Sequence, residues 1–213
     1  MARAWTLRYV VQKLEISLKE ALEKAAPGSQ ISEYANTFYR TFHKPLTTEI
    51  YLAGNAMLPT LGQKTKGDSP ASTLASMEKL IVRQLHDPST ESLFVGDVVA
   101  FTNPLEAAGA KKGGYLVRRI AACDGEEMVS SSPGEDSFTL EPGYCWVLAD
   151  NMELPPSQAR DSRLFGPVPM SSVLGRVVYY HRSATEHGMV QNSEPAHWMD
   201  EPVLQCELDP ESI

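Results

Sequence analysis

The sequence predicts a mainly β protein with helices at its N-terminus and an extended acidic tail at its C-terminus. Three observations support this. Residues 46–185 hold short apolar or alternating runs separated by clusters of Gly, Pro, Asp and Ser, which is typical of strands and turns. Residues 1–45 carry apolar side chains at spacings of three and four, the period of a helix. Residues 186–213 hold seven of the 27 acidic residues and none of the 19 Lys and Arg residues.

The first expected element is a helix between Ala4 and Ala26, a stretch without proline or glycine that ends at Pro27. One side of this helix is apolar and consists of Leu7, Val10, Val11, Leu14, Leu18 and Leu22. Basic residues precede the first acidic residue, Glu15, so the N-terminus resembles a mitochondrial targeting sequence. An amphipathic helix that docks on a partner or on its own domain stays open as the alternative.

A second helix is expected from Ile31 to Phe42, with an aromatic stripe of the kind that packs in a core or an interface. The strands follow in the middle of the chain. They are expected at Glu49–Leu52, Lys79–Arg83, Asp97–Phe101, Tyr115–Ala121, Phe138–Leu140, Cys145–Leu148 and Arg176–Tyr180. Residues 62–76 and 103–114 are polar or rich in glycine, and we expect them to form exposed loops.

The acidic tail supplies most of the formal net charge of −8. Apolar residues such as Trp198 and Met199 lie among its acids, so the tail is predicted to lie on a basic protein surface and to become ordered there. A solvated, disordered tail stays open as the alternative. Direct binding of nucleic acid is not expected, because the tail and the phosphate backbone are both negative.

No cofactor or metal site is predicted from the remaining reactive residues. The five histidines and three cysteines are scattered, without a close-spaced pair such as HxxxH or CxxC; they are His43, His86, His181, His187, His197, Cys123, Cys145 and Cys206. No run of about 18 apolar residues is present, so no transmembrane anchor is expected.

Residues 54–60, Gly-Asn-Ala-Met-Leu-Pro-Thr, form the most informative segment. The segment resembles the nucleophile box of the type I signal peptidases, the family of the bacterial leader peptidase and the mitochondrial inner-membrane peptidase, which reads Gly-x-Ser-Met-x-Pro-Thr. Gly54, Met57, Pro59 and Thr60 match it. Ala56 stands at the place of the serine, and its methyl group has no lone pair with which to form an acyl-enzyme.

Further boxes of the same family follow in the family's order between Thr47 and His181. The matching positions are Gly96, Asp97, Arg119, Asp150, Asn151, Asp161, Ser162, Arg163, Gly166 and Pro167. The resemblance implies a coiled antiparallel β domain of the signal-peptidase type, in which these residues look structural. It implies that Asp150, Asp161 and Arg163 form a charge cluster without chemistry of its own.

The same resemblance places the general-base lysine of the family at Arg118 and the serine that orients this lysine at Ala159. A guanidinium stays protonated in proteins and cannot serve as that base. Ser157 lies two positions from the orienting serine and does not replace it. Since a buried cation needs a partner, we expect Arg118 to reach a carboxylate or backbone carbonyls near the site.

These substitutions indicate a catalytically degenerate relative, not an enzyme. We expect a structural or interaction subunit of a mitochondrial assembly, such as the mitochondrial ribosome or an inner-membrane complex, in the matrix or peripheral to the inner membrane. The predicted division is a helical segment 1–45, a β domain 46–185 and an acidic tail 186–213. Two alternatives stay open. One is a pseudo-protease that binds an extended peptide in the former cleft by strand addition. The other is a serine–lysine signal peptidase captured as an inactive mutant.

Overall fold

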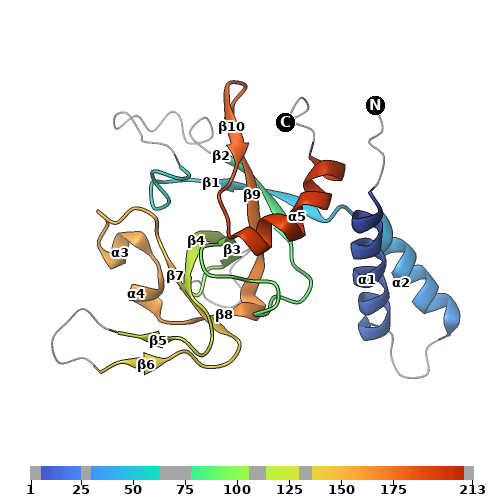
Figure 1. The fold of residues 1–213 in the computed structure, drawn as a ribbon, viewed down its shortest axis with the longest axis horizontal. Helices are drawn as coiled ribbons and strands as arrows, with labels where there is room; N and C mark the ends of the chain where they lie inside the picture. The colour runs from blue at the N-terminus through green and yellow to red at the C-terminus, as the bar shows by residue number, and fades with distance from the viewer. Residues whose placement is uncertain (1–5, 25–29, 63–77, 106–113, 130–135, 209–213) are drawn as a thin grey trace. The chain divides into compact units, whose positions relative to one another are not determined.

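The computed structural model describes residues 6–24, 30–62, 78–105, 114–129 and 136–208 (Figure 1). The chain folds into two compact units. One comprises Met1–Thr48 with Met199–Ile213, and the other comprises Glu49–Trp198. Most of the two predicted loops, 62–76 and 103–114, lies outside the described residues. Among the described residues, no helix has both the length and the apolar composition needed to cross a bilayer.

The N-terminal helices of the first unit are α1 (Leu7–Lys24) and α2 (Ile31–His43), which confirms both predicted helices. The predicted apolar side of α1 is not the side that is buried. Leu7, Val11, Leu14, Leu18 and Leu22 are between 41% and 79% exposed. The opposite side is buried, and it consists of Tyr9, Lys13, Ser17, Glu20 and Ala21.

Hydrogen bonds explain how this polar side of α1 is tolerated in the interior of the unit. The Ser17 hydroxyl donates to the Lys13 carbonyl at 2.6 Å, and the Thr41 hydroxyl of α2 donates to the Glu20 carboxylate at 3.0 Å. Buried polar groups cost little when they are hydrogen-bonded in this way. The helical period therefore predicts the helix correctly, while the buried side is set by specific polar partners.

The acidic tail differs from the predicted extended form over part of its length, because Glu194–Glu207 form the helix α5. The last residue of this helix, Glu207, accepts hydrogen bonds from the backbone amides of Leu46 and Thr47 at 2.8 and 2.9 Å. Val203 packs with Leu46 and Tyr9. An acid of the tail thus binds the chain itself.

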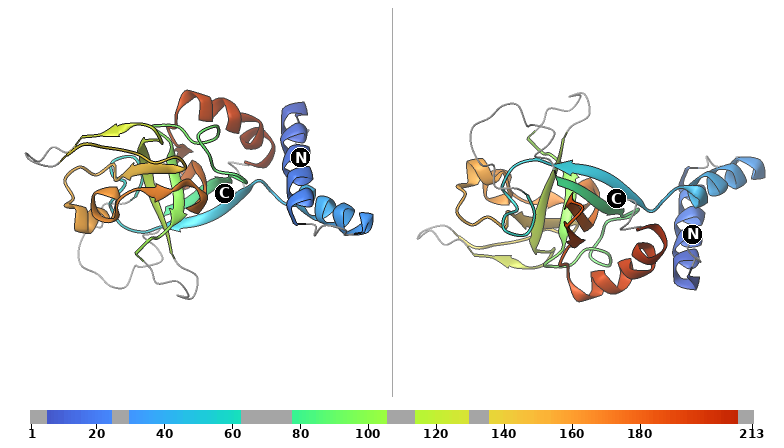
Figure 2. Two further views of the ribbon diagram at one scale, coloured as in Figure 1. Left: turned by 90° about the horizontal axis from the view of Figure 1, so that it is seen from below. Right: turned by 90° about the horizontal axis from the view of Figure 1, so that it is seen from above.

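The second unit is built on one large antiparallel sheet, which confirms the predicted mainly β fold. Its strand order is β1-β2-β9-β3-β4-β7-β8, with β10 paired to β9. The strands are β1 (Thr47–Leu52), β2 (Glu78–Gln84), β3 (Val98–Thr102), β4 (Tyr115–Ala122), β7 (Tyr144–Leu148), β8 (Val168–Pro169), β9 (Val173–Ser183) and β10 (Glu186–Met189). A separate ribbon of β5 (Glu127–Met128) and β6 (Phe138–Thr139) extends away from this sheet (Figures 1 and 2).

The central strand β3 shows why the sheet is buried on both faces. Its side chains alternate, so Val98 and Ala100 belong to one core cluster while Val99 and Phe101 belong to another. Two short helices, α3 (Pro156–Ala159) and α4 (Ser162–Phe165), then carry the chain from β7 to β8. The 3-10 turn η2 (Met170–Ser172) follows β8 and leads into β9.

Candidate functional site

The segment 54–60 forms a turn directly after β1. Met57 is buried in the core of the sheet, which fixes this turn, and Ala56 is partly exposed beside it. Asn151 holds the turn from the other side. Its backbone amide donates to the Ala56 carbonyl at 3.0 Å, and its side-chain amide donates to the Asn55 carbonyl at 3.0 Å. The nucleophile-like box and the Asp-Asn box, about a hundred residues apart in the chain, therefore lie in direct contact.

Arg118 lies on β4 and is buried, with only 4% of its surface exposed. Its two terminal nitrogens donate to main-chain carbonyls, one to Val117 and one to Ala159. The expectation that the guanidinium reaches backbone carbonyls is therefore confirmed. Burial lowers the pKa of Arg118 to about 10, an effect that Asp161 opposes and Arg160 reinforces. The group is still protonated at neutral pH, so it cannot accept a proton there.

Asp161 is the carboxylate that acts on Arg118 through space, but its own oxygens are already in use. It caps α4 by accepting from the Arg163 backbone amide at 3.1 Å, and it pairs with the Arg163 guanidinium at 2.8 Å. It also accepts from the Ala149 amide at 3.1 Å. Burial would raise the pKa of Asp161, yet these hydrogen bonds outweigh it and lower the pKa.

The predicted charge cluster is split between two places. Asp161 pairs with Arg163, whereas Asp150 makes a two-pronged pair with Arg119 at 2.9 and 2.7 Å. Arg119 also donates to the Gly96 carbonyl at 2.7 Å, so it ties the start of β3 to the end of β7. Both pairs hold main-chain segments in place, which is a structural task.

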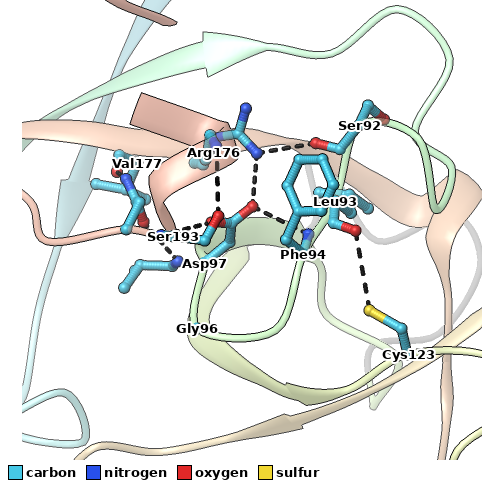
Figure 3. Close-up of polar contacts among 12 residues, drawn as sticks. Ser92, Leu93, Phe94, Gly96, Asp97, Cys123, Arg176, Val177 and Ser193 are labelled. Atoms are coloured by element: carbon cyan, nitrogen blue, oxygen red, sulfur yellow. Dashed lines mark hydrogen bonds and ion pairs between the residues drawn. The ribbon is translucent and has the colours of Figure 1, made fainter. Parts of the chain in front are cut away.

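Asp97 is fully buried and organises a third group of polar contacts (Figure 3). One oxygen pairs with Arg176 at 2.6 Å and accepts from the Phe94 amide at 3.1 Å. The other accepts from the Ser193 amide and hydroxyl at 3.0 and 2.7 Å. Each oxygen of this carboxylate thus has two donors, which offsets the cost of burying the charge.

A cavity of about 330 Å³ lies between the end of β1 and the first half of β4. Its lining includes Ala56 and Arg118, and also Leu52, Tyr115, Gln158 and Arg160. The structure therefore brings Ala56 and Arg118 to one cavity, and Ala159 joins them through its carbonyl, while its buried methyl carries no hydroxyl. Ser157 lies exposed on α3.

Cys123 and Cys145 offer no substitute nucleophile at neutral pH. Burial raises the pKa of Cys145 to about 12, and burial together with nearby acids raises that of Cys123 to about 11. A thiol becomes a good nucleophile only as a thiolate. Both groups therefore remain protonated and behave as packing residues.

Two residues with contacts in this region have little or no signal in the sequence. Arg160 follows α3 with a left-handed backbone, at a φ of 49°, and lines the cavity. Arg176 completes the Asp97 group from β9. The only available signal for Arg160 was its place next to Asp161, and nothing in the sequence links Arg176 to a carboxylate 79 positions away.

Comparison with known proteins gives consistent relatives. The chain is 36% identical over 203 residues to "Mitochondrial ATP-independent inner membrane protease subunit 2" of Arabidopsis thaliana, covering 95% of this chain and 91% of that protein. It is 30% identical over 118 residues to "Mitochondrial inner membrane protease subunit 1" of Schizosaccharomyces pombe, covering 54% and 69%. The human subunit 1 is 24% identical over 105 residues, covering 48% and 58%. No family model matches the chain.

Proposed function

We propose that this chain is a non-catalytic subunit of a mitochondrial protein assembly. The chain belongs to the mitochondrial inner membrane protease branch of the signal-peptidase family. The chain is a mitochondrial protein, as the inner membrane protease subunits that it resembles are. In this proposal the β domain, residues 46–185, is an inherited scaffold. The segments 1–45 and 186–213 make the contacts of the assembly, in the matrix or at the inner-membrane surface.

The observation that carries the proposal is the state of Arg118. The position that the family resemblance gives to the base holds a guanidinium that is charged at neutral pH and tied to the Ala159 carbonyl. Ala56 in the same cavity has no nucleophilic atom. A serine–lysine reaction needs both groups, so the arrangement supports loss of the chemistry.

A cleavage assay tests the catalytic part of the proposal. The wild type and the double variant Ala56→Ser with Arg118→Lys are incubated with a precursor peptide that an active relative cuts. We expect no cleavage by either protein, because the buried Ala159 offers no hydroxyl to orient the new lysine, and a misplacement of about 1 Å can cost roughly a hundredfold in rate. Robust cleavage by the double variant would mean that the scaffold is still competent and that only two side chains are lacking.

The exposed side of α1 supports the assembly part. Its leucines form a continuous apolar stripe, defined here as Leu7, Val11, Leu14, Leu18 and Leu22. Large exposed apolar patches mark interaction surfaces. Acidic residues Glu15 and Glu23 lie on the same helix as its basic residues, which disfavours an anionic lipid surface and favours a protein partner with an apolar stripe of its own.

Native mass spectrometry of the complex purified from mitochondria tests this part. The stripe variant carries Leu14→Asp and Leu18→Asp. Its matched control carries Leu105→Asp and Leu164→Asp, two similarly exposed leucines of the β domain with the same change in charge. We expect the stripe variant to lose its partner and the control to keep it. If both variants retain the partner, α1 is not the interface.

A second candidate function is a pseudo-protease that holds a peptide without cutting it. The cavity at Ala56 and Arg118 favours this function. It is lined by the first half of β4, and in the described chain one edge of β4 from Tyr115 to Arg118 has no neighbouring strand. The two candidates are compatible, since the stripe and the cavity involve different residues.

A further inference from the structure

The cavity at Arg118 has an unusual charge balance. Two of its lining residues are charged, Arg118 and Arg160, and both are cationic. None of the described residues that line it is acidic. A small cavity whose described lining carries two guanidinium groups and no carboxylate favours an anionic ligand, because Arg matches a carboxylate or phosphate with a pair of hydrogen bonds.

Arg118 still has hydrogen-bonding capacity that the chain does not use. Two of its nitrogens donate to carbonyls, but the buried Nε has no partner among the described residues. No carboxylate of the described chain forms an ion pair with it, and Asp161 is occupied by Arg163 and two backbone amides. A buried cation without a counter-ion is costly, so an incoming anion would gain a strong interaction there.

Arg160 is the second arginine that lines the same cavity. It ends α3 with its amide donating to the Pro156 carbonyl at 2.9 Å, and its left-handed backbone is uncommon for a residue other than glycine. Its side chain is exposed and forms no ion pair within the described residues. One arginine of the cavity lining is therefore buried and the other is exposed.

The walls of the cavity suit a peptide backbone. β1 is the last strand at one end of the sheet order. On β4, residues Tyr115 to Arg118 pair with β3 on one side, whereas β7 pairs with the other side only from Arg119 onward. In the described chain the first half of β4 thus has an unpaired edge, and an extended peptide can add hydrogen bonds to such an edge.

We propose that this cavity binds the free C-terminal carboxylate of an extended peptide, with Arg118 and Arg160 as the carboxylate-binding residues. The inference rests on the proposed absence of cleavage, because the ligand must remain bound and intact. The carboxylate enters from the open side of β4, and the residues before it lie along the strand edge.

Fluorescence anisotropy tests the proposal on the full-length chain. The probe is a pentapeptide of alanine and valine labelled with fluorescein at its N-terminus, made once with a free carboxylate and once as the C-terminal amide. We expect the free acid to bind about tenfold more tightly or better, because charge-assisted hydrogen bonds are the strong ones. Mass spectrometry of the recovered peptide shows whether it stayed intact.

Three variants assign the effect. Arg118→Gln should remove the preference for the acid. Arg160→Gln should weaken it severalfold and, as a change at an exposed residue, should leave the fold intact. Arg40→Gln, the same change on exposed α2, is the matched control and should bind as the wild type does.

Several outcomes would overturn the proposal. One is equal affinity for acid and amide. Another is an unchanged preference in the folded Arg160→Gln variant. A third is full displacement by an equal concentration of sodium acetate or phosphate, which would indicate a site for small anions. A cut peptide would instead overturn the proposed function, so the two failures are distinguishable.

Discussion

Arg118 and Arg176 are two buried arginines at the same level of one sheet, and their guanidinium groups have different kinds of partner. Both are paired in register with Val99 of β3, Arg118 from β4 and Arg176 from β9. Arg176 is fully buried and faces the carboxylate of Asp97 at 2.6 Å. Arg118 has only carbonyls and an unused Nε.

The difference separates a structural charge from a charge that is available to a ligand. The Asp97–Arg176 pair is closed within the chain, because both oxygens of Asp97 are occupied by donors of the fold itself. None of the described residues that line the cavity at Arg118 supplies such a carboxylate. Burial alone therefore does not distinguish the two arginines, whereas the presence of a counter-ion does.

The largest expected effect is the loss of the closed pair. Asp97→Ala leaves Arg176 buried without its carboxylate and should lower the free energy of unfolding by about 3–5 kcal/mol. Urea denaturation measures it. Glu49→Gln breaks the more exposed pair with Lys79 and should cost about 0–1 kcal/mol. Equal losses in the two variants would show that the buried Asp97–Arg176 pair contributes no more to stability than the exposed pair does.

The effect of Asp161 should be intermediate and depend on pH. Asp161→Asn removes the negative charge and one of the two acceptor oxygens of a buried carboxylate, and should cost about 1.5–3 kcal/mol at neutral pH. The folded protein lowers the pKa of Asp161, so the stabilisation is present above the usual aspartate pKa of about 3.9 and is lost as the pH falls through the lower native value. Thermal unfolding from pH 7 to pH 3 should show the two proteins converging at the acid end.

Arg163→Met sharpens this prediction. Among the groups that lower the pKa of Asp161, the Arg163 side chain has the largest effect. Without it the native pKa of Asp161 moves up toward the unfolded value, so the acid-dependent loss of stability should be smaller and should end at a higher pH than in the wild type. An unchanged acid profile would mean that the backbone amides alone hold the carboxylate ionised.

The smallest expected effect on stability is at Arg118. Arg118→Met replaces a buried cation without a counter-ion by an apolar side chain of comparable length, and stability should be unchanged or raised by about 1 kcal/mol. Arg176→Met is the matched comparison and should lose about 3–5 kcal/mol, because it strands Asp97. Urea denaturation of both proteins decides the matter. A large loss at Arg118 would show that it too is a structural arginine.

Much of the scaffold follows from the sequence for clear reasons. Alternating apolar residues and turn clusters predict β1, β2, β3, β4, β6, β7 and β9, and the family resemblance of the boxes assigns Ala56, Arg118 and Ala159 to one site. The helices α1 and α2 follow from their period. These features depend on local patterns, which a single sequence contains.

Other features depend on partners that are distant in the chain. Period alone cannot show which side of α1 is buried, because the buried polar side relies on contacts such as that of Thr41 with Glu20. The helix α5 does have a local signal, since Ser193 caps it by accepting from the Ala196 amide at 3.3 Å. Pro202 inside the helix weighs against that signal, because proline removes a helical hydrogen bond.

The main-chain anchoring of Arg118 also bears on how such a site can change over time. The carbonyls of Val117 and Ala159 are present whatever side chains those positions carry. An arginine can therefore replace a lysine there in a single mutational step, without a second substitution to receive its charge. The Asp97–Arg176 pair has no such freedom, because either partner alone would be stranded. Within one domain, the former position can drift one residue at a time, while the latter can change only as a pair.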